Sequence, residues 1–127
     1  MSCIFCDIAK GYAPAEIFMK NADCVAIVPI NIEVDGHLLV LPTQHYETIL
    51  DIPRDLLGRV MGFVKEVCVD LQLNWKFSGF NFLNASGAVA GQSVQHFHVH
   101  ILPRNDDDGI DAWPDLPGGM NIYEDKL

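Results

Sequence analysis

Apolar and polar positions alternate strictly over residues 96–101, and a further apolar residue follows, in the sequence His-Phe-His-Val-His-Ile-Leu of residues 96–102. Successive side chains of a β-strand point to opposite faces, whereas on a helix these three histidines would share no face. The segment is therefore predicted to be a strand that turns its apolar residues into a core. The opposite face would carry three imidazoles in one row: His96, His98 and His100.

A long helix is predicted to begin near residues 51–53, because proline is tolerated in a first turn and apolar residues then recur with helical spacing. This stripe is predicted to be core without a chemical role. It consists of Leu56, Leu57, Val60, Met61, Val64, Val67, Cys68 and Leu71. Gly58, Gly62 and Val69 lie off the stripe, which suggests close approach by another element, such as a partner subunit.

Other short apolar runs bounded by turn residues are predicted to be strands: 17–19, 24–28, 37–41 and 78–84. Residues 7–12 are predicted to form a short helix that ends at Gly11. The elements follow in the order strand, strand, strand, helix, strand, strand, and the links between neighbouring strands are short. This order indicates an α+β fold, with an antiparallel sheet of about five strands and the long helix on one face.

The 127 residues are predicted to form a single domain, 1–127, with a core at about 3–104 and an acidic tail at 105–127. The net charge of −9 argues against general binding to nucleic acid, which needs a basic surface. The sequence shows neither a signal-peptide pattern nor a stretch of about 18 apolar residues. A cytoplasmic protein without membrane association is therefore expected.

A row of three imidazoles on one strand face has two chemical interpretations. The row could hold a metal ion, since alternate histidines on a strand can chelate zinc. It could also support nucleophilic catalysis, with a neutral imidazole attacking phosphorus while its neighbours hold the phosphate oxygens. The segment 87–93 favours catalysis, because its small residues allow backbone N–H groups to approach an anion closely.

The segment 91–104, Gly-Gln-Ser-Val-Gln-His-Phe-His-Val-His-Ile-Leu-Pro-Arg, resembles the signature of the histidine triad (HIT) superfamily of nucleotide hydrolases and transferases. The segment 36–42 with His45, and the Trp113-Pro114 pair, also resemble this family. The resemblance implies the HIT-like fold, a homodimer and a purine nucleotide substrate such as AMP or GMP. In some branches of the family the tail reaches across the dimer toward the neighbouring active site.

In this family the middle histidine is the nucleophile, which corresponds to His98 here. The resemblance places His96 and His100 beside the phosphate and Ser93 beside the leaving group. It also implies that these positions contact the nucleotide: His37, Asn84, Gly91, Gln92 and Ser93. Transferase branches carry glutamine at the third histidine, so His100 indicates hydrolysis. The expected substrates are nucleoside phosphoramidates, acyl nucleotides or dinucleoside polyphosphates, cleaved at the α-phosphate through a covalent nucleotidyl-histidine without a catalytic metal.

Pro29 departs from the family pattern, in which Asp or Asn at this position holds the ribose hydroxyls. Proline has no side-chain acceptor. Asn31, two residues later, could replace that contact if the loop bends inward. The departure leaves an alternative function open, namely a nucleotide-binding or sensor module with little turnover.

Cys3 and Cys6 form a CxxC pair, which is a weak signal by itself. Some family members with such a pair bind a structural zinc ion with two histidines, and the matching positions are His45 and His96. Two cysteines and two histidines suit tetrahedral zinc. A structural Zn²⁺ site at these four residues is therefore expected, and a ligated His96 could not act as a free acid.

Overall fold

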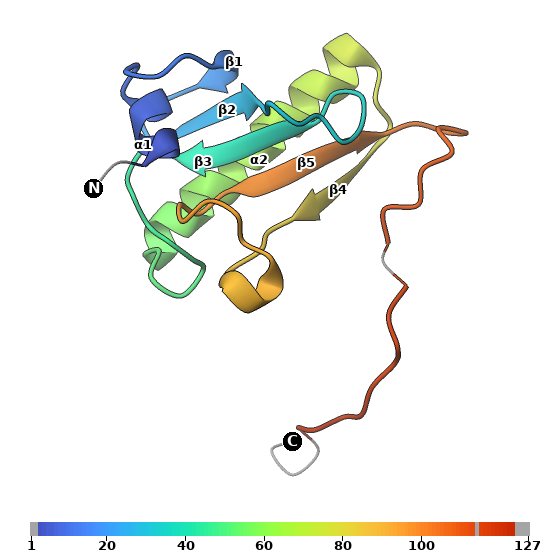
Figure 1. Ribbon diagram of the computed structural model, residues 1–127. Coiled ribbons are helices and arrows are strands. Elements are labelled where there is room, and N and C mark those ends of the chain that lie inside the picture. Colours follow the sequence, from blue (N-terminus) through green and yellow to red (C-terminus); the bar gives the residue numbers. More distant parts are fainter. Residues whose placement is uncertain (1–2, 114, 124–127) are drawn as a thin grey trace.

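The computed structural model describes residues 3–113 and 115–123. It contains one antiparallel sheet with the strand order β1-β2-β3-β5-β4 (Figure 1). The strands are β1 (Glu16–Lys20), β2 (Cys24–Val28), β3 (Leu38–Pro42), β4 (Gly79–Leu83) and β5 (Val99–Arg104). The helices are α1 (Ile4–Ala9), α2 (Arg54–Trp75) and the 3₁₀ turn η1 (Ala88–Ala90). The predicted α+β class is confirmed.

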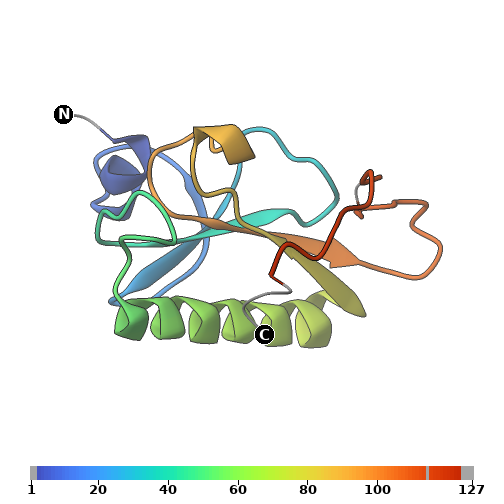
Figure 2. The same cartoon turned by 90° about the horizontal axis from the view of Figure 1, so that it is seen from below.

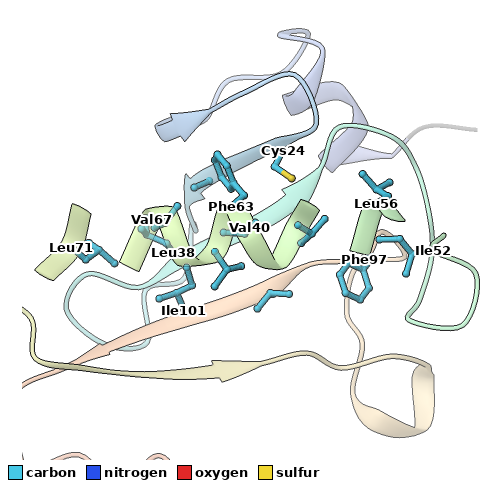
Figure 3. Packing of buried hydrophobic residues seen from close by; sticks show 14 residues of the cluster. Cys24, Leu38, Val40, Ile52, Leu56, Phe63, Val67, Leu71, Phe97 and Ile101 are labelled. Atoms are coloured by element: carbon cyan, nitrogen blue, oxygen red, sulfur yellow. The ribbon is translucent and has the colours of Figure 1, made fainter. Parts of the chain in front are cut away.

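Helix α2 lies along one face of the sheet, while α1 and η1 lie on the opposite side (Figure 2). The main core fills the space between α2 and the sheet, where Phe63 and Val67 meet Val40 and Ile101 (Figure 3). Burying these side chains supplies the main driving force for folding. Since α2 covers only one face of the sheet, the opposite side has room for a second, smaller apolar cluster and for a site.

Most residues of the predicted apolar stripe of α2 face the core, but the prediction is wrong at two positions. Met61 is 42% exposed, whereas Phe63, outside the predicted stripe, is buried. Seven residues separate Leu56 from Phe63, which is nearly two full helical turns, so both side chains point to the sheet. Met61 lies at the border of this face and remains in solvent.

A smaller apolar cluster covers the other face of the sheet. Phe5 and Ile8 of α1 pack there against side chains of β2 and β3: Val25, Ile27, Leu39 and Leu41. Strands β2 and β3 are therefore buried on both faces, which explains their continuous apolar runs. This cluster anchors α1 beside the histidine-rich segment.

Two predicted boundaries are corrected. Helix α1 begins at Ile4 rather than at Asp7, because Cys3 Sγ accepts a hydrogen bond from the Cys6 N–H at 3.4 Å and caps the helix. Strand β5 begins at Val99, so His96 and His98 precede it. Residues 96–99 are all buried, and the expected regular row of three histidines is not formed.

Beyond β5 the chain leaves the sheet as an extended tail (Figure 1). The Arg104 guanidinium fixes this exit by donating to both Asp108 carboxylate oxygens, at 2.8 and 2.9 Å. Trp113 is 76% exposed, and Pro114 lies outside the described residues. Among the residues that the structure describes, no helix has the length and apolar character to cross a membrane.

Candidate active site

The ring of His98 is oriented by the backbone just before it. Its Nδ1–H donates to the His96 carbonyl oxygen at 2.7 Å. The proton on Nδ1 leaves the lone pair of a neutral imidazole on Nε2. His98 lies on the wall of a cleft and is only 5% exposed. The site therefore holds an oriented nitrogen nucleophile in a largely dehydrated position.

His37 and His100 form a hydrogen-bonded pair whose tautomers follow from their contacts. His37 Nδ1 accepts the Glu33 backbone N–H at 3.1 Å, so the proton of a neutral His37 is on Nε2. That Nε2–H then donates to His100 Nδ1 at 2.9 Å. His100 must carry its own proton on Nε2, which makes this nitrogen a hydrogen-bond donor at the cleft that His100 lines.

Burial keeps both members of this pair neutral. It lowers the pKa of His37, although the Glu33 carboxylate opposes the change. Burial, with smaller contributions from His98 and His37, lowers the pKa of His100 to about 4. At neutral pH His100 is therefore a neutral donor and not a cation.

The cleft beside these histidines has a volume of about 450 Å³, within the range of small-molecule sites. One wall is apolar and is formed by Ile4, Phe5, Ile8, Ile27, Pro29, Ile30 and Leu39. The polar lining comprises Glu16, Asn31, Glu33, His37, Ser93, His98 and His100. An apolar wall that ends in a few convergent polar groups suits a ligand with an aromatic base and a charged end.

The small-residue loop before β5 is held by amide side chains. Gln92 Oε1 accepts the Gly87 N–H at 2.8 Å, and its Nε2 donates to the Val94 carbonyl at 3.0 Å. Gly91, with a φ of +88°, adopts the left-handed conformation that favours glycine. Asn84 Nδ2 donates to the His98 carbonyl at 2.8 Å. The Gln92 amide and Asn84 Nδ2, expected to contact phosphate, are thus bound to the protein backbone, and Asn84 Oδ1 accepts from the Ser86 hydroxyl at 2.8 Å.

Four other residues converge on one point behind the cleft. The ligand atoms of Cys3, Cys6, His45 and His96 all lie within 4.8 Å of one another. His96 Nδ1 lies 3.4 Å from Cys3 Sγ and 3.5 Å from Cys6 Sγ, and His45 Nδ1 lies 3.3 Å from Cys6 Sγ. Tetrahedral bonds of about 2.0–2.3 Å place ligand atoms about 3.3–3.8 Å apart, so these three distances fit zinc.

The hydrogen bonding of His96 also fits a metal ligand. Its Nε2–H donates to the Pro42 carbonyl at 2.9 Å, which leaves the lone pair on Nδ1 facing the sulfurs. Burial, and next the Cys3 thiol, raise the pKa of Cys6, so a thiolate at Cys6 calls for a compensating cation. His96 is fully buried, and its ring lies with the sulfurs instead of beside His98 and His100 in the cleft.

Residues 10–107 match the model of the HIT domain family. This match, together with the fold and the histidine arrangement, shows that the chain belongs to the histidine triad (HIT) family. An uncharacterized HIT-like protein of Methanocaldococcus jannaschii is 40% identical over 107 residues, which is 84% of this chain and 82% of that protein. Adenosine 5'-monophosphoramidase of Candida albicans is 32% identical over 110 residues, 84% of this chain and 72% of that enzyme.

Among solved structures, a zinc-bound histidine triad family protein from Mycobacterium smegmatis superimposes with a TM-score of 0.83 at 28% identity. The match covers 93% of this chain and 85% of the other. The resemblance to the HIT family inferred from the sequence is thereby confirmed.

The sequence did not reveal every group that shapes the site. The Pro42 carbonyl and the Glu33 N–H are backbone groups, whose positions depend on folding and leave no side-chain signal. Phe5, whose ring centroid lies 5.2 Å from that of His98, has no polar group that would mark it in the sequence as part of a site. Its place between Cys3 and Cys6 was the one available clue.

Proposed function

We propose that this protein is a nucleotide hydrolase that acts at the α-phosphate through a covalent nucleotidyl-His98. Its substrates are nucleoside phosphoramidates, acyl nucleotides or dinucleoside polyphosphates. The observation that supports this most directly is the 2.7 Å hydrogen bond from His98 Nδ1–H to the His96 carbonyl, since it keeps the Nε2 lone pair available at the cleft. The similarity to the Candida albicans monophosphoramidase supports the same reaction class.

In the first step, His98 Nε2 attacks the α-phosphorus, and the bond between phosphorus and the leaving group breaks. The ring becomes cationic, and its Nδ1–H bond to the His96 carbonyl strengthens as the charge develops. The leaving group takes a proton from the Ser93 hydroxyl as it departs. Water then attacks the phosphorus and gives one proton back to Ser93, the phosphorus–nitrogen bond breaks, and a nucleoside monophosphate leaves with His98 neutral again.

His37 and His100 stabilise the transferred phosphoryl group. Because His37 fixes the tautomer of His100, the Nε2–H of His100 is available as a donor to a phosphoryl oxygen. Such a preoriented donor in a dehydrated site commonly makes a large contribution to catalysis. We assign Gln92, Asn84 and Gly91 to shaping the phosphate loop, and His96 to orienting His98 through its carbonyl.

The nucleotide proposed for the cleft is a purine monophosphate such as AMP or GMP. The base would lie against the apolar wall that includes Phe5 and Ile8, with its phosphate toward His98. Asn31, also on the cleft lining, is the proposed ribose contact in place of Pro29.

We also propose that Cys3, Cys6, His45 and His96 hold a structural zinc ion. The spacing of the donor atoms and the tautomer of His96 support this assignment. A bound zinc ion would compensate the charge of the thiolates and tie the N-terminal segment to the segment before β5. The chemistry at phosphorus needs no metal, so turnover at saturating substrate should persist in excess chelator.

A binding module with little turnover is the second candidate. Pro29 cannot hold a ribose hydroxyl, and Glu16 and Glu33 place two carboxylates on the cleft, which disfavours a bound phosphate. AMP binding without cleavage of any compound in a phosphoramidate and polyphosphate panel would select this candidate.

The test of the proposed reaction is the variant His98→Ala, assayed with adenosine 5'-monophosphoramidate. Because the nucleophile is removed, kcat should fall by at least about 10³-fold. The circular dichroism spectrum should remain close to that of the wild type, since the His98 side chain is not part of the main core. Undiminished turnover in this variant would refute the proposed mechanism.

A further inference from the structure

The metal cluster and the nucleotide cleft share one short helix, α1. Cys3 caps the helix and Cys6 lies within it, and both belong to the cluster. Ile4, Phe5 and Ile8 of the same helix belong to the cleft wall. A helix of six residues is too short to persist by itself in water, so its conformation depends on what anchors it.

Phe5 connects this helix to the proposed nucleophile. Its ring is only 7% exposed and lies edge-on to His98, with centroids 5.2 Å apart and planes at 85°. It also lies edge-on to His96, at 5.9 Å and 78°. Edge-to-face contacts of this kind are favourable and restrict ring orientation. A displacement of α1 would therefore remove a neighbour from the His98 ring and open the cleft wall.

His96 provides a second connection between the two sites. Its Nδ1 faces the cysteine sulfurs, while its backbone carbonyl accepts the Nδ1–H of His98. One residue thus joins the cluster to the hydrogen bond that orients the nucleophile. Both connections lie outside the main core between α2 and the sheet, which contains no residue of α1.

We propose that metal occupancy of the cluster controls the affinity of the cleft for nucleotide, by fixing α1 and through it Phe5 and the His98 ring. This inference rests on the proposed nucleotide function. With metal bound, the wall is already assembled when the nucleotide arrives. Without metal, α1 is held by the small cluster around Phe5 and Ile8 and by weak contacts of Cys3 and Cys6 with His45 and His96, so nucleotide binding must also order the wall.

The coupling must be reciprocal. If metal tightens nucleotide binding by some factor, bound nucleotide tightens metal binding by the same factor. Couplings between two sites in one domain commonly amount to about 5–150-fold, and we expect about tenfold here. Removal of the metal should raise KM and the dissociation constant of the nucleotide. The value of kcat at saturating substrate should be retained.

The first experiment measures AMP binding by calorimetry to the zinc-loaded full chain and to the chain freed of metal by a chelator. The metal-free chain should bind AMP about tenfold more weakly, with α2 and the sheet intact by circular dichroism. Zinc affinity, measured against a competing chelator, should rise by the same factor at saturating AMP. Because AMP is bound and not turned over, no assay of catalysis is needed.

The variant Phe5→Leu tests the route of the coupling, with Tyr12→Leu as its matched control, since Tyr12 is 80% exposed and does not line the cleft. Zinc-loaded Phe5→Leu should retain its metal but bind AMP nearly as weakly as the metal-free wild type. Tyr12→Leu should keep the full coupling. If the metal-free chain does not fold, the AMP affinity of the zinc-loaded Phe5→Leu variant is the deciding measurement. An affinity equal to that of the wild type would then overturn the proposal.

The two proposals fail in different ways. Equal AMP affinity with and without zinc overturns the coupling and leaves the hydrolase proposal standing. If neither the zinc-loaded nor the metal-free chain binds AMP, both the coupling and the hydrolase proposal are overturned.

Discussion

His37 and His100 show how hydrogen bonds at single residues determine a chemical role. Only one proton arrangement satisfies the contacts of the neutral pair, because His37 Nδ1 already accepts the Glu33 N–H. The sequence indicated that these histidines belong to the site, but not which nitrogen carries each proton. That information comes from backbone positions, which depend on the whole fold.

The low pKa of His100, about 4, leads to a testable pH dependence. An unfolded histidine titrates near 6.5, so between about pH 6.5 and pH 4 the unfolded chain binds a proton that folded His100 does not. The free energy of unfolding should therefore fall as the pH decreases through this window. His100→Gln should reduce this fall by an amount on the order of 1 kcal/mol, after allowance for the partial exposure of His100.

Two measurements check this prediction. Urea unfolding at pH 7 and pH 4.5 compares the wild type with His100→Gln, and histidine NMR titration follows the ring of His100 directly. A titration midpoint near pH 6.5 for His100 would contradict the account.

At the level of elements, the alternating pattern over residues 96–102 predicted a strand, yet β5 includes only its second half. A period of two identifies extended backbone but cannot show where sheet pairing starts. His96 is held by the Pro42 carbonyl and by the cysteine cluster, both distant in sequence. The long helix and the sheet were predictable because their apolar spacing is regular, whereas such distant contacts leave no local pattern.

Gly36 controls how the loop before β3 delivers His37 to the cleft. Its φ is +80°, and an added Cβ would lie 2.9 Å from the Phe77 ring and 3.2 Å from Pro103. Gly36→Ala should therefore destabilise the protein by about 2–3 kcal/mol, from backbone strain plus the clash. Thermal unfolding measures this loss.

The matched control is Gly11→Ala. Gly11 has nearly the same φ, +79°, but nothing lies within 4 Å of an added Cβ. The Gly11→Ala variant should therefore lose only the roughly 1 kcal/mol of stability that backbone strain costs. Equal losses in the two variants would show that the packing around Gly36 is not restrictive.

At the scale of the whole molecule, the homodimer implied by the family resemblance stays a prediction, as does the single-domain boundary. Strand β4 forms one edge of the sheet and exposes the apolar side chains of Phe82 and Leu83. An exposed apolar edge strand can pair with another chain. We therefore expect β4 to contribute to the contact between subunits.

Sedimentation analysis should find a particle of about 28 kDa, twice the chain mass of 14.1 kDa. Phe82→Lys should shift the equilibrium toward monomer, because a charge would be buried in the contact. Ile17→Lys, on strand β1 at the opposite edge of the sheet and 46% exposed, should leave the dimer intact. A wild-type protein that is monomeric at micromolar concentration would contradict this prediction.

The central claim is that a neutral imidazole at position 98 bonds transiently to the phosphorus of a nucleotide. It is tested most directly by trapping that bond. The protein is mixed with a nucleoside phosphoramidate labelled at phosphorus, quenched within the first turnover and mapped by mass spectrometry. We expect a nucleotidyl group on Nε2 of His98. Turnover with no adduct on His98, or an adduct on another residue, would contradict it.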